Sequence, residues 1–258
     1  MNKPSGVTPD SSGGIYVSDF SNSRVLYLAT GSTTASRVYG QGGNFTTATL
    51  NKGGISATSL YNPTNVALDS SGGIYVSDFS NSRVLYFATG STTASRVYGQ
   101  GGDFTTGTEN KGGISATSLN KSTGVIPDSS GGIYVCDQTN HRVLYFATGS
   151  TTASRVYGQG GNFATVTINM GGISATSLHN PTYVALDSSG GIYVCDQTNN
   201  RVLYFATGST TASRVYGQGG NFTTGTLNKG GKSATSLSYP FGVALDSSEW
   251  GALCFRLF

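Results

Sequence analysis

The sequence predicts an all-β fold built from equivalent four-stranded antiparallel sheets, and two observations carry that prediction. The string Asp-Ser-Ser-Gly-Gly-Ile-Tyr-Val opens at Asp10, Asp69, Asp128 and Asp187, so it returns every 59 residues. A fixed period of tens of residues is typical of an array of equivalent supersecondary units. Each repeat also holds several short segments rich in β-branched and aromatic residues, and none has helical periodicity. We therefore expect a single array over residues 1–258, with repeats at about 1–59, 60–118, 119–177 and 178–236 and a partial repeat at 237–258.

The second repeat shows the expected elements in order. Its strands are predicted at 65–69, 73–78, 83–88 and 94–100. The first two strands are joined by Asp69-Ser-Ser-Gly72, which has Asp first and Gly fourth, as a type I turn prefers. A polar turn at Phe79–Ser82 joins the second and third strands. A loop rich in Gly, Thr, Asn and Ser, from Gly101 to Lys121, then leads to the next repeat.

Four sequential antiparallel strands and a return loop describe one blade of a β-propeller. The apolar runs in the second and third strands are nearly continuous, which suits a sheet packed on both faces. Pro9 and Pro127 fall within the first strand of two repeats, and proline is tolerated in an edge strand but not in a central one. The first strand is therefore predicted to be innermost, facing a central channel. A β-solenoid is the alternative architecture, although its coils are generally shorter than this repeat.

The repeated residues resemble a known propeller family. The pattern Asn-Pro-Thr-x-Val-Ala-Leu-Asp-x-x-Gly-Gly-Ile-Tyr-Val-x-Asp-x-x-Asn-x-Arg-Val-Leu-Tyr-Phe runs through Asn62–Phe87 and again through Asn180–Phe205. It is similar to the NHL repeat, and Asn140-His-Arg142 comes close to the tripeptide that names the family. The following Val-Tyr-Gly-Gln-Gly-Gly and Asn-Lys-Gly-Gly-Ile-Ser-Ala-Thr-Ser-Leu segments look like a long-blade tandem variant. This resemblance implies a propeller fold but no particular activity, because function depends on the site rather than on the fold.

The number of repeats predicts an incomplete, open propeller. NHL-like propellers usually close with about six blades, whereas this chain supplies four complete four-stranded units and one extra first strand at Gly242–Asp246. The tail from Glu249 leaves the pattern, and a reading frame shifted by one base would permit the start of a fifth blade there. Uncapped ends of a repeat array expose apolar faces, which gives a route to self-association through the open blade edges. Closure as a four-bladed ring, or as an eight-bladed ring of two chains, is the alternative.

Composition excludes several partners. The formal net charge is only +3, and eight of the nine arginines recur at two repeated positions, so we expect framework arginines and no nucleic-acid partner. No segment reaches transmembrane length, so no membrane span is expected. The cellular compartment is not determined by the sequence; an extracellular or cell-surface location would follow if the parent protein is longer.

Cys136 and Cys195 occupy equivalent positions of adjacent repeats and are interpreted as buried free thiols, because equivalent atoms of neighbouring blades lie too far apart for a disulfide.

No catalytic constellation, metal cluster or cofactor motif stands out. Asp19, Asp78, Asp137 and Asp196 each precede an arginine by five residues in every repeat, which favours a structural ion pair. Asp10 and its equivalents are interpreted as caps of their turns. The two histidines occupy different repeat positions, and no Cys/His cluster has metal-ligand spacing. The alternatives to a binding scaffold are a metal-dependent channel enzyme, which the resemblance implies through the peptide-amidating lyases, and a truncated array product without independent function.

The candidate binding residues lie where nearly identical repeats differ. In the turn between the second and third strands, and just before the first strand, the side chains change from copy to copy. We expect both positions to be loops on a rigid scaffold, where binding residues tend to sit. The predicted ligand is a protein or a glycan, and neutral drift in exposed loops is the alternative interpretation. The candidate residues are Phe20, Phe79, Gln138, Gln197, His141, Tyr61, Asn65, His179 and Tyr183.

Overall fold

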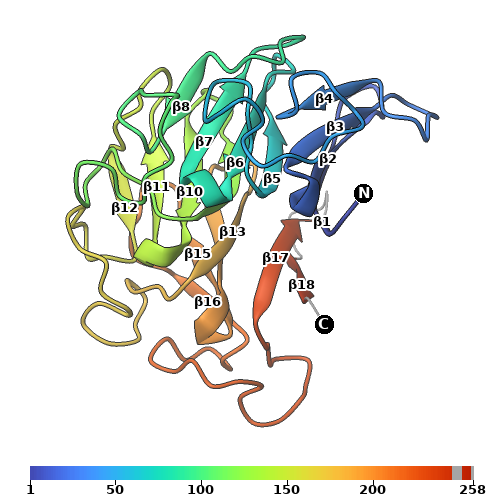
Figure 1. Ribbon diagram of the computed structural model, residues 1–258. Coiled ribbons are helices and arrows are strands. Elements are labelled where there is room, and N and C mark those ends of the chain that lie inside the picture. The colour runs from blue at the N-terminus through green and yellow to red at the C-terminus, as the bar shows by residue number, and fades with distance from the viewer. Residues whose placement is uncertain (246–251, 257–258) are drawn as a thin grey trace.

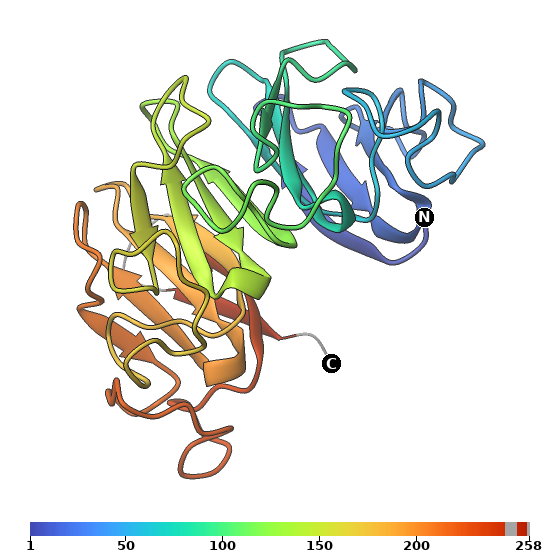
Figure 2. The ribbon, with the colours of Figure 1, turned by 60° about the vertical axis from the view of Figure 1, so that its left-hand side comes forward.

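The computed structural model describes residues 1–245 and 252–256 and confirms an all-β propeller array. Four antiparallel sheets of four strands each follow one another along the chain, and within every sheet the strands lie in sequence order. Figures 1 and 2 show these blades side by side along an arc. The strands are β1 (Pro4–Pro9), β2 (Ile15–Asp19), β3 (Arg24–Leu28), β4 (Arg37–Tyr39), β5 (Pro63–Leu68), β6 (Ile74–Asp78), β7 (Arg83–Phe87), β8 (Arg96–Tyr98), β9 (Ser122–Pro127), β10 (Ile133–Asp137), β11 (Arg142–Phe146), β12 (Arg155–Tyr157), β13 (Pro181–Leu186), β14 (Ile192–Asp196), β15 (Arg201–Phe205) and β16 (Arg214–Tyr216).

A fifth, partial unit follows the four blades. Its first strand is β17 (Pro240–Leu245), which is the predicted extra strand; Asp246 lies outside the described residues. The structure adds a partner strand that the sequence does not indicate, β18 (Ala252–Arg256), paired antiparallel with β17 as β2 pairs with β1. The rest of the tail, residues 249–251 and 257–258, is likewise outside the described part of the chain.

The turn between the first two strands of a blade is held by one aspartate. Asp69 Oδ1 accepts hydrogen bonds from the Ser71 N–H (2.9 Å), the Ser71 hydroxyl (2.7 Å) and the Gly73 N–H (2.8 Å), and its Oδ2 accepts the Tyr86 hydroxyl at 2.8 Å. Burial raises the pKa of Asp69, but these donors outweigh it and hold that pKa below its usual value. Gly72 has φ of +83°, which suits glycine. The predicted capping role is confirmed, and the same contacts recur at Asp10, Asp128 and Asp187.

The second turn is a single 3₁₀ turn. The polar segment between strands two and three forms η1 (Phe20–Asn22), η2 (Phe79–Asn81), η3 (Gln138–Asn140) and η4 (Gln197–Asn199). In η2, the Ser82 N–H donates to the Phe79 carbonyl at 3.0 Å, which closes the turn, and Ser82 has a left-handed φ of 50°. The turn therefore holds the start of β7 directly beside the end of β6.

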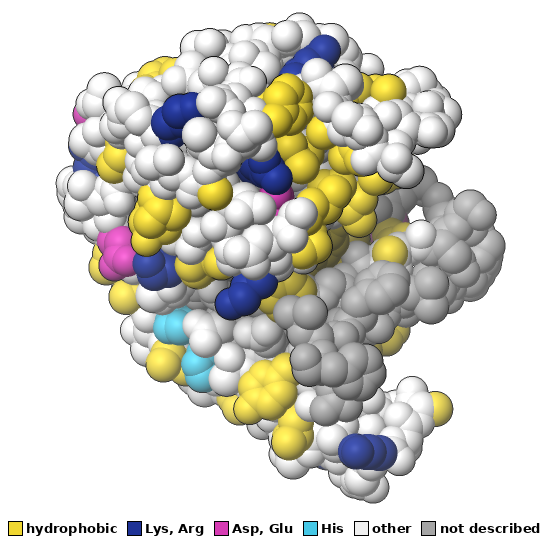
Figure 3. Space-filling model, turned by 45° about the vertical axis from the view of Figure 1, so that its right-hand side comes forward, with side chains coloured by type: hydrophobic (Ala, Val, Ile, Leu, Met, Phe, Trp, Pro, Cys, Tyr) yellow, Lys and Arg dark blue, Asp and Glu magenta, His cyan; other side chains and the backbone are white. Residues whose placement is uncertain are grey.

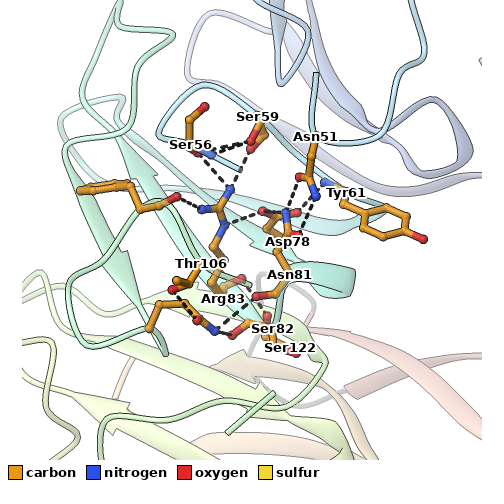
Figure 4. Close-up of polar contacts among 12 residues, drawn as sticks. Asn51, Ser56, Ser59, Tyr61, Asp78, Asn81, Ser82, Arg83, Thr106 and Ser122 are labelled. Atoms are coloured by element: carbon orange, nitrogen blue, oxygen red, sulfur yellow. Dashed lines mark hydrogen bonds and ion pairs between the residues drawn. The ribbon is translucent and has the colours of Figure 1, made fainter. Parts of the chain in front are cut away.

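The predicted aspartate–arginine pair is structural, and it also joins blades. Arg83 Nε lies 2.7 Å from Asp78 Oδ2, with both side chains fully buried. The same guanidinium donates to the Ser56 and Ser59 carbonyls of the preceding loop, each at 3.0 Å, and to the Phe104 carbonyl at 2.7 Å (Figure 4). The equivalent arginines of blades 2, 3 and 4 therefore each clamp their own blade to the loop that leads into it.

The core lies between blades rather than inside one sheet. Tyr39 of blade 1 meets Phe87 of blade 2 edge-on, with ring centroids 5.2 Å apart, and the same contact joins blades 2 and 3 and blades 3 and 4. The first strands are innermost, as the prolines predict: β1 packs beside β5, β5 beside β9, β9 beside β13 and β13 beside β17. Ser5, Thr64 and Thr182 each donate a hydroxyl hydrogen bond to carbonyls of the next first strand.

The array is open at blade 1. Val66 packs into the core that blades 1 and 2 share and is 0% exposed, and its equivalents in the later first strands are at most 3% exposed. Val7 holds the same position in β1 but is 63% exposed. The difference arises because no blade precedes β1 among the described residues. The predicted open propeller is therefore confirmed.

Two smaller predictions can also be compared with the structure. Cys136 and Cys195 are buried and form no disulfide within the described residues, as expected, and burial raises the pKa of the Cys136 thiol. No helix within the described residues is long and apolar enough to cross a bilayer.

Candidate functional site

The 3₁₀ turns and the segments before the first strands lie together on one face of the array. The Tyr61 N–H donates to Asp78 Oδ1 at 2.7 Å, and the Ser80 N–H donates to the Tyr61 carbonyl at 3.1 Å. Asn120 and His179 make the same backbone contact with the aspartates of their blades. We call this surface, formed by η1–η4 and residues 61, 120 and 179, the turn face. It gathers Phe20, Phe79, Gln138, Gln197, Tyr61 and His179 of the predicted set.

The turn face is aromatic over blades 1 and 2. The rings of Phe20 and Phe79 lie with centroids 6.3 Å apart and planes tilted by 52°. Lys121 Nζ stands 5.4 Å from the centroid of the Phe79 ring, a cation–π distance. Phe20, Phe79 and Tyr61 are all partly exposed. The surface there therefore combines apolar rings with the ion pair of Lys121 and Glu109, whose Nζ and Oε1 atoms lie 2.9 Å apart.

Over blades 3 and 4 the same positions are polar. Gln138 and Gln197 replace the two phenylalanines and are partly exposed at the start of η3 and η4. The backbone of these turns matches η1 and η2, since all four end in a residue with left-handed φ between 50° and 54°. The fold therefore accepts either phenylalanine or glutamine at this position.

His141 has a structural role that the sequence does not reveal. Its Nδ1 accepts a hydrogen bond from the Asn180 N–H at 3.2 Å, which links blade 3 to the segment entering blade 4. The serine or asparagine side chains at the equivalent positions accept the same bond from the residue 39 positions later, at 3.0 to 3.3 Å. Serine, histidine and asparagine share a side-chain acceptor. Their variation therefore preserves a contact between blades.

The two histidines meet on the turn face. His179 packs edge-on against His141 with ring centroids 5.2 Å apart, and both cyan side chains are visible in Figure 3. Burial, reinforced by the neighbouring His179, lowers the pKa of His141, and burial also lowers the pKa of His179. Both rings are thereby kept neutral over a wider pH range than a free imidazole.

Asn65 and Tyr183 lie in strands, not in the loops that the sequence suggests. They belong to β5 and β13 and line a central cavity of about 420 Å³ surrounded by the first strands of all five units. Burial raises the pKa of the Tyr183 hydroxyl, and the nearby Asn65 side chain partly offsets that shift. Asn65 Oδ1 also accepts the Val125 N–H at 3.0 Å, so part of its role is to join two first strands.

Crowding between inner strands explains the variation at this position. Glycines occupy the equivalents in the other units, and a Cβ at Gly124 would lie 2.9 Å from the Thr182 carbonyl and 3.0 Å from the Tyr183 Cα. A Cβ at Gly6 would lie 2.9 Å from the Thr64 carbonyl. A side chain in one blade thus alternates with glycine in the next, because the strands approach too closely for both.

Sequence reasoning missed two residues of these surfaces. Lys121 sits over Phe79, although it comes from the loop before β9. Phe241 lines the cavity at a position where the four blades carry serine or threonine. The replacement of a hydroxyl side chain by Phe241 is visible in the sequence and could have marked this position as a candidate. The contact of Lys121 with a ring of another blade could be found only from the tertiary structure.

Within the described residues, no group of three or more His, Cys, Asp or Glu side chains could hold a metal ion. The geometry that remains is a set of rigid blades with two surfaces of interest, the turn face and the inner cavity. The repeat pattern itself matches a family model, described as the NHL repeat, at residues 1–26 and 60–87. The matched segments, which span most of the first three strands of blades 1 and 2, are therefore similar to NHL repeats.

Solved structures similar to this chain are β-propeller-like. A streptogramin B lyase matches with 14% identity and a TM-score of 0.51, covering 83% of this chain and 54% of that one. Virginiamycin B lyase from Staphylococcus aureus matches with 13% identity and a TM-score of 0.55, covering 95% of this chain and 61% of that one. Hydrazine synthase from Kuenenia stuttgartiensis matches with 11% identity and a TM-score of 0.56, covering 83% and 49%.

At these identities the likeness concerns the fold. The chain spans about half to three-fifths of the length of the structures it matches. A comparison with curated proteins found no match.

Proposed function

We propose that this NHL-repeat array is a non-catalytic scaffold that binds a protein ligand through the turn face of blades 1 and 2. The observation that carries the proposal is the partly exposed pair of Phe20 and Phe79 beside Lys121. Large aromatic side chains with a neighbouring cation are typical anchors of protein interfaces.

The internal repeats supply the reason to connect this pair with binding. The Asp–Arg clamps, the turn aspartates and the aromatic contacts between blades recur in blade after blade because the fold requires them. Phe20 and Phe79 differ from those residues, since Gln138 and Gln197 stand in the same 3₁₀ turns of the later blades. An exposed phenylalanine that the fold does not need costs solubility unless a ligand covers it.

The chain offers its own substitution to test the proposal. A Phe20→Gln/Phe79→Gln double variant carries the side chains of blades 3 and 4, so its melting temperature should match that of the unaltered chain. The unaltered chain, this double variant and a control variant would each be immobilised and exposed to an extract of the source organism, and the bound proteins would be quantified by mass spectrometry. A Gln138→Ala/Gln197→Ala variant is the matched control.

The proposal expects at least one protein that the unaltered chain and the control retain, and that the phenylalanine double variant loses by about tenfold or more. That protein would then be purified, and its affinity for the unaltered chain and for each variant would be measured. Equal capture by all three proteins would reject the turn face as the binding surface. Retention of a glycan instead, lost in the same double variant, would keep the surface but replace the ligand class.

An enzyme using the inner cavity is the second candidate, because two of the similar structures are lyases. Tyr183 is the one titratable side chain among the described residues that line that cavity. Zn²⁺ or Ca²⁺ retained after purification, together with turnover of a streptogramin B substrate that Tyr183→Phe abolishes, would favour this candidate over the scaffold.

A further inference from the structure

The last blade ends in an open cup. At the other junctions the equivalent place is filled by side chains of the next blade. The cup has a volume of about 470 Å³ and lies between β16 and the loop before β17. It is lined by Val215, Tyr216, Gly217, Ala234, Ser236 and Leu237.

In blades 1 to 3 the equivalent place is occupied by two side chains of the next blade. Between blades 1 and 2, the Arg83 guanidinium donates to the carbonyls of Ser56 and Ser59, and the Phe87 ring packs edge-on against Tyr39. The next two junctions repeat this arrangement with Arg142 and Phe146, and with Arg201 and Phe205. One internal site is thus seen three times with the same occupant.

A main-chain hydrogen bond completes each filled site. The Ala94 N–H donates to the Ala57 carbonyl at 2.9 Å, and the corresponding bonds at the next two junctions are also 2.9 Å long. The occupant is therefore an extended segment that offers an arginine, a phenylalanine four residues later and an N–H from the following strand connection. Residues four apart in a strand project from the same face, so both side chains can enter one site.

The cup of blade 4 presents the same tyrosine, leucine and loop residues to solvent, without the aspartate that pairs with the arginine at each filled site. Tyr39, Tyr98 and Tyr157 are each 2% exposed, whereas Tyr216 is partly exposed. The leucine beside the tyrosine is fully buried at the three filled sites, but Leu237 is also partly exposed. The loop residues Ser233, Ala234 and Ser236 correspond to Ser56, Ala57 and Ser59, whose carbonyls accept the occupant.

The neighbouring strand is also an edge. Within the described residues β18 pairs with β17, whereas the second strand of every complete blade also pairs with a third strand. An added strand beside β18 would hold the position that β7 holds beside β6. Strand addition to a sheet edge, with pockets for alternate side chains, is an established way for a protein to bind a peptide.

We propose that the cup binds an extended polypeptide segment carrying an arginine and, four residues later, a phenylalanine. The guanidinium donates to the carbonyls of Ser233 and Ser236, and the phenylalanine ring packs on Tyr216. A folded second copy fits less well, because its outermost blade presents Arg24 and has Leu28 in place of the phenylalanine. This site is separate from the turn face and does not depend on the proposed function.

The test uses the full chain and a synthetic peptide. A fluorescein-labelled peptide of residues 81–100, which contains Arg83, Phe87 and Ala94, is titrated with the protein and followed by fluorescence anisotropy up to about 100 µM. Peptides with Arg83→Lys and with Phe87→Ala are compared with it. Tyr216→Ala alters the cup, and Tyr239→Ala, at a residue 52% exposed outside the cup, is the protein control.

Saturable binding is expected, weakened about tenfold or more by Phe87→Ala and by Arg83→Lys, because lysine lacks the fork that reaches two carbonyls. Tyr216→Ala should weaken it similarly and Tyr239→Ala should not. Absent binding, equal binding of all three peptides, or binding indifferent to Tyr216→Ala would overturn the proposal. The peptide series needs only the unaltered protein, so it decides the matter even if Tyr216→Ala does not fold. Chain dimers that exclude the peptide would show that a second copy is the occupant and would also overturn it.

Discussion

Replacing Arg142 by methionine should destabilise the protein far more than the same change at Arg24. Arg142 is fully buried and donates to Asp137 at 2.7 Å and to the carbonyls of Ser115 and Ser118 at 3.0 Å each. Arg24 makes the same ion pair with its own aspartate at 2.8 Å, but its side chain is 13% exposed and, among the described residues, it has no loop of a preceding blade to clamp.

The expected magnitudes follow from these contacts. Removing one partner of a buried ion pair costs about 3–5 kcal/mol of unfolding free energy, because the other charge stays buried and unpaired. For a domain of this size that cost lowers the melting temperature by roughly 6–20 °C. Arg24→Met should cost about 1–2 kcal/mol, since water reaches the pair and fewer acceptors are left unsatisfied.

Both variants would be compared with the unaltered chain by urea unfolding and by thermal melts followed with circular dichroism. A second change, Asp137→Asn in the Arg142→Met background, removes the unpaired charge and should restore at least about 1 kcal/mol. Equal losses at Arg142 and Arg24, or no recovery in the double variant, would refute the view that these arginines hold blade to blade.

Three further outcomes are expected. Folding lowers the pKa of His141, so below about pH 6.5 the unfolded state binds more protons than the folded state. The contribution of His141 to the free energy of unfolding should therefore be complete above that pH and fall as the pH drops toward the folded pKa. His141→Asn keeps a side-chain acceptor for the bond between blades and should flatten that acid loss in urea unfolding from pH 7 to 5; an unchanged slope would contradict the assignment. Gly73→Ala should lower the free energy of unfolding by about 1–3 kcal/mol in thermal or urea unfolding, because its Cβ would lie 2.5 Å from a tyrosine hydroxyl. A Cβ at Gly90 would meet nothing within 4 Å, so Gly90→Ala should cost only the strain of its positive φ. Cys136 and Cys195 should resist a thiol reagent until urea unfolds the chain, since both are buried; rapid labelling of either in native protein would show that its blade opens.

The repeat pattern was enough to predict the strand order, the turn aspartates and the ion pairs. These features depend on residues close in sequence: Asp69 caps a turn ending four residues later, and Asp78 pairs with an arginine five residues away. The prediction that the first strand is innermost also held, because proline lacks the N–H that a central strand must donate.

The sites were harder to predict, because variation has several causes that look alike in sequence. His141 varies among residues that share a hydrogen-bond acceptor, and Tyr183 varies because inner strands leave room for a side chain only opposite glycine. Phe20 and Phe79 vary on a face where the described contacts leave them partly exposed.

The sequence by itself determined the blades, since each turn and strand is specified by local contacts that repeat with the period of the chain. The tertiary structure decided what lies between blades: which side chains of one repeat fill the site left by the preceding repeat, which end is open, and where a filled site at three junctions becomes an open cup at the last. Those contacts join residues 20 to 60 positions apart, and each needs a neighbouring blade to exist. An identical sequence motif is therefore buried in the middle of the array and exposed at its ends.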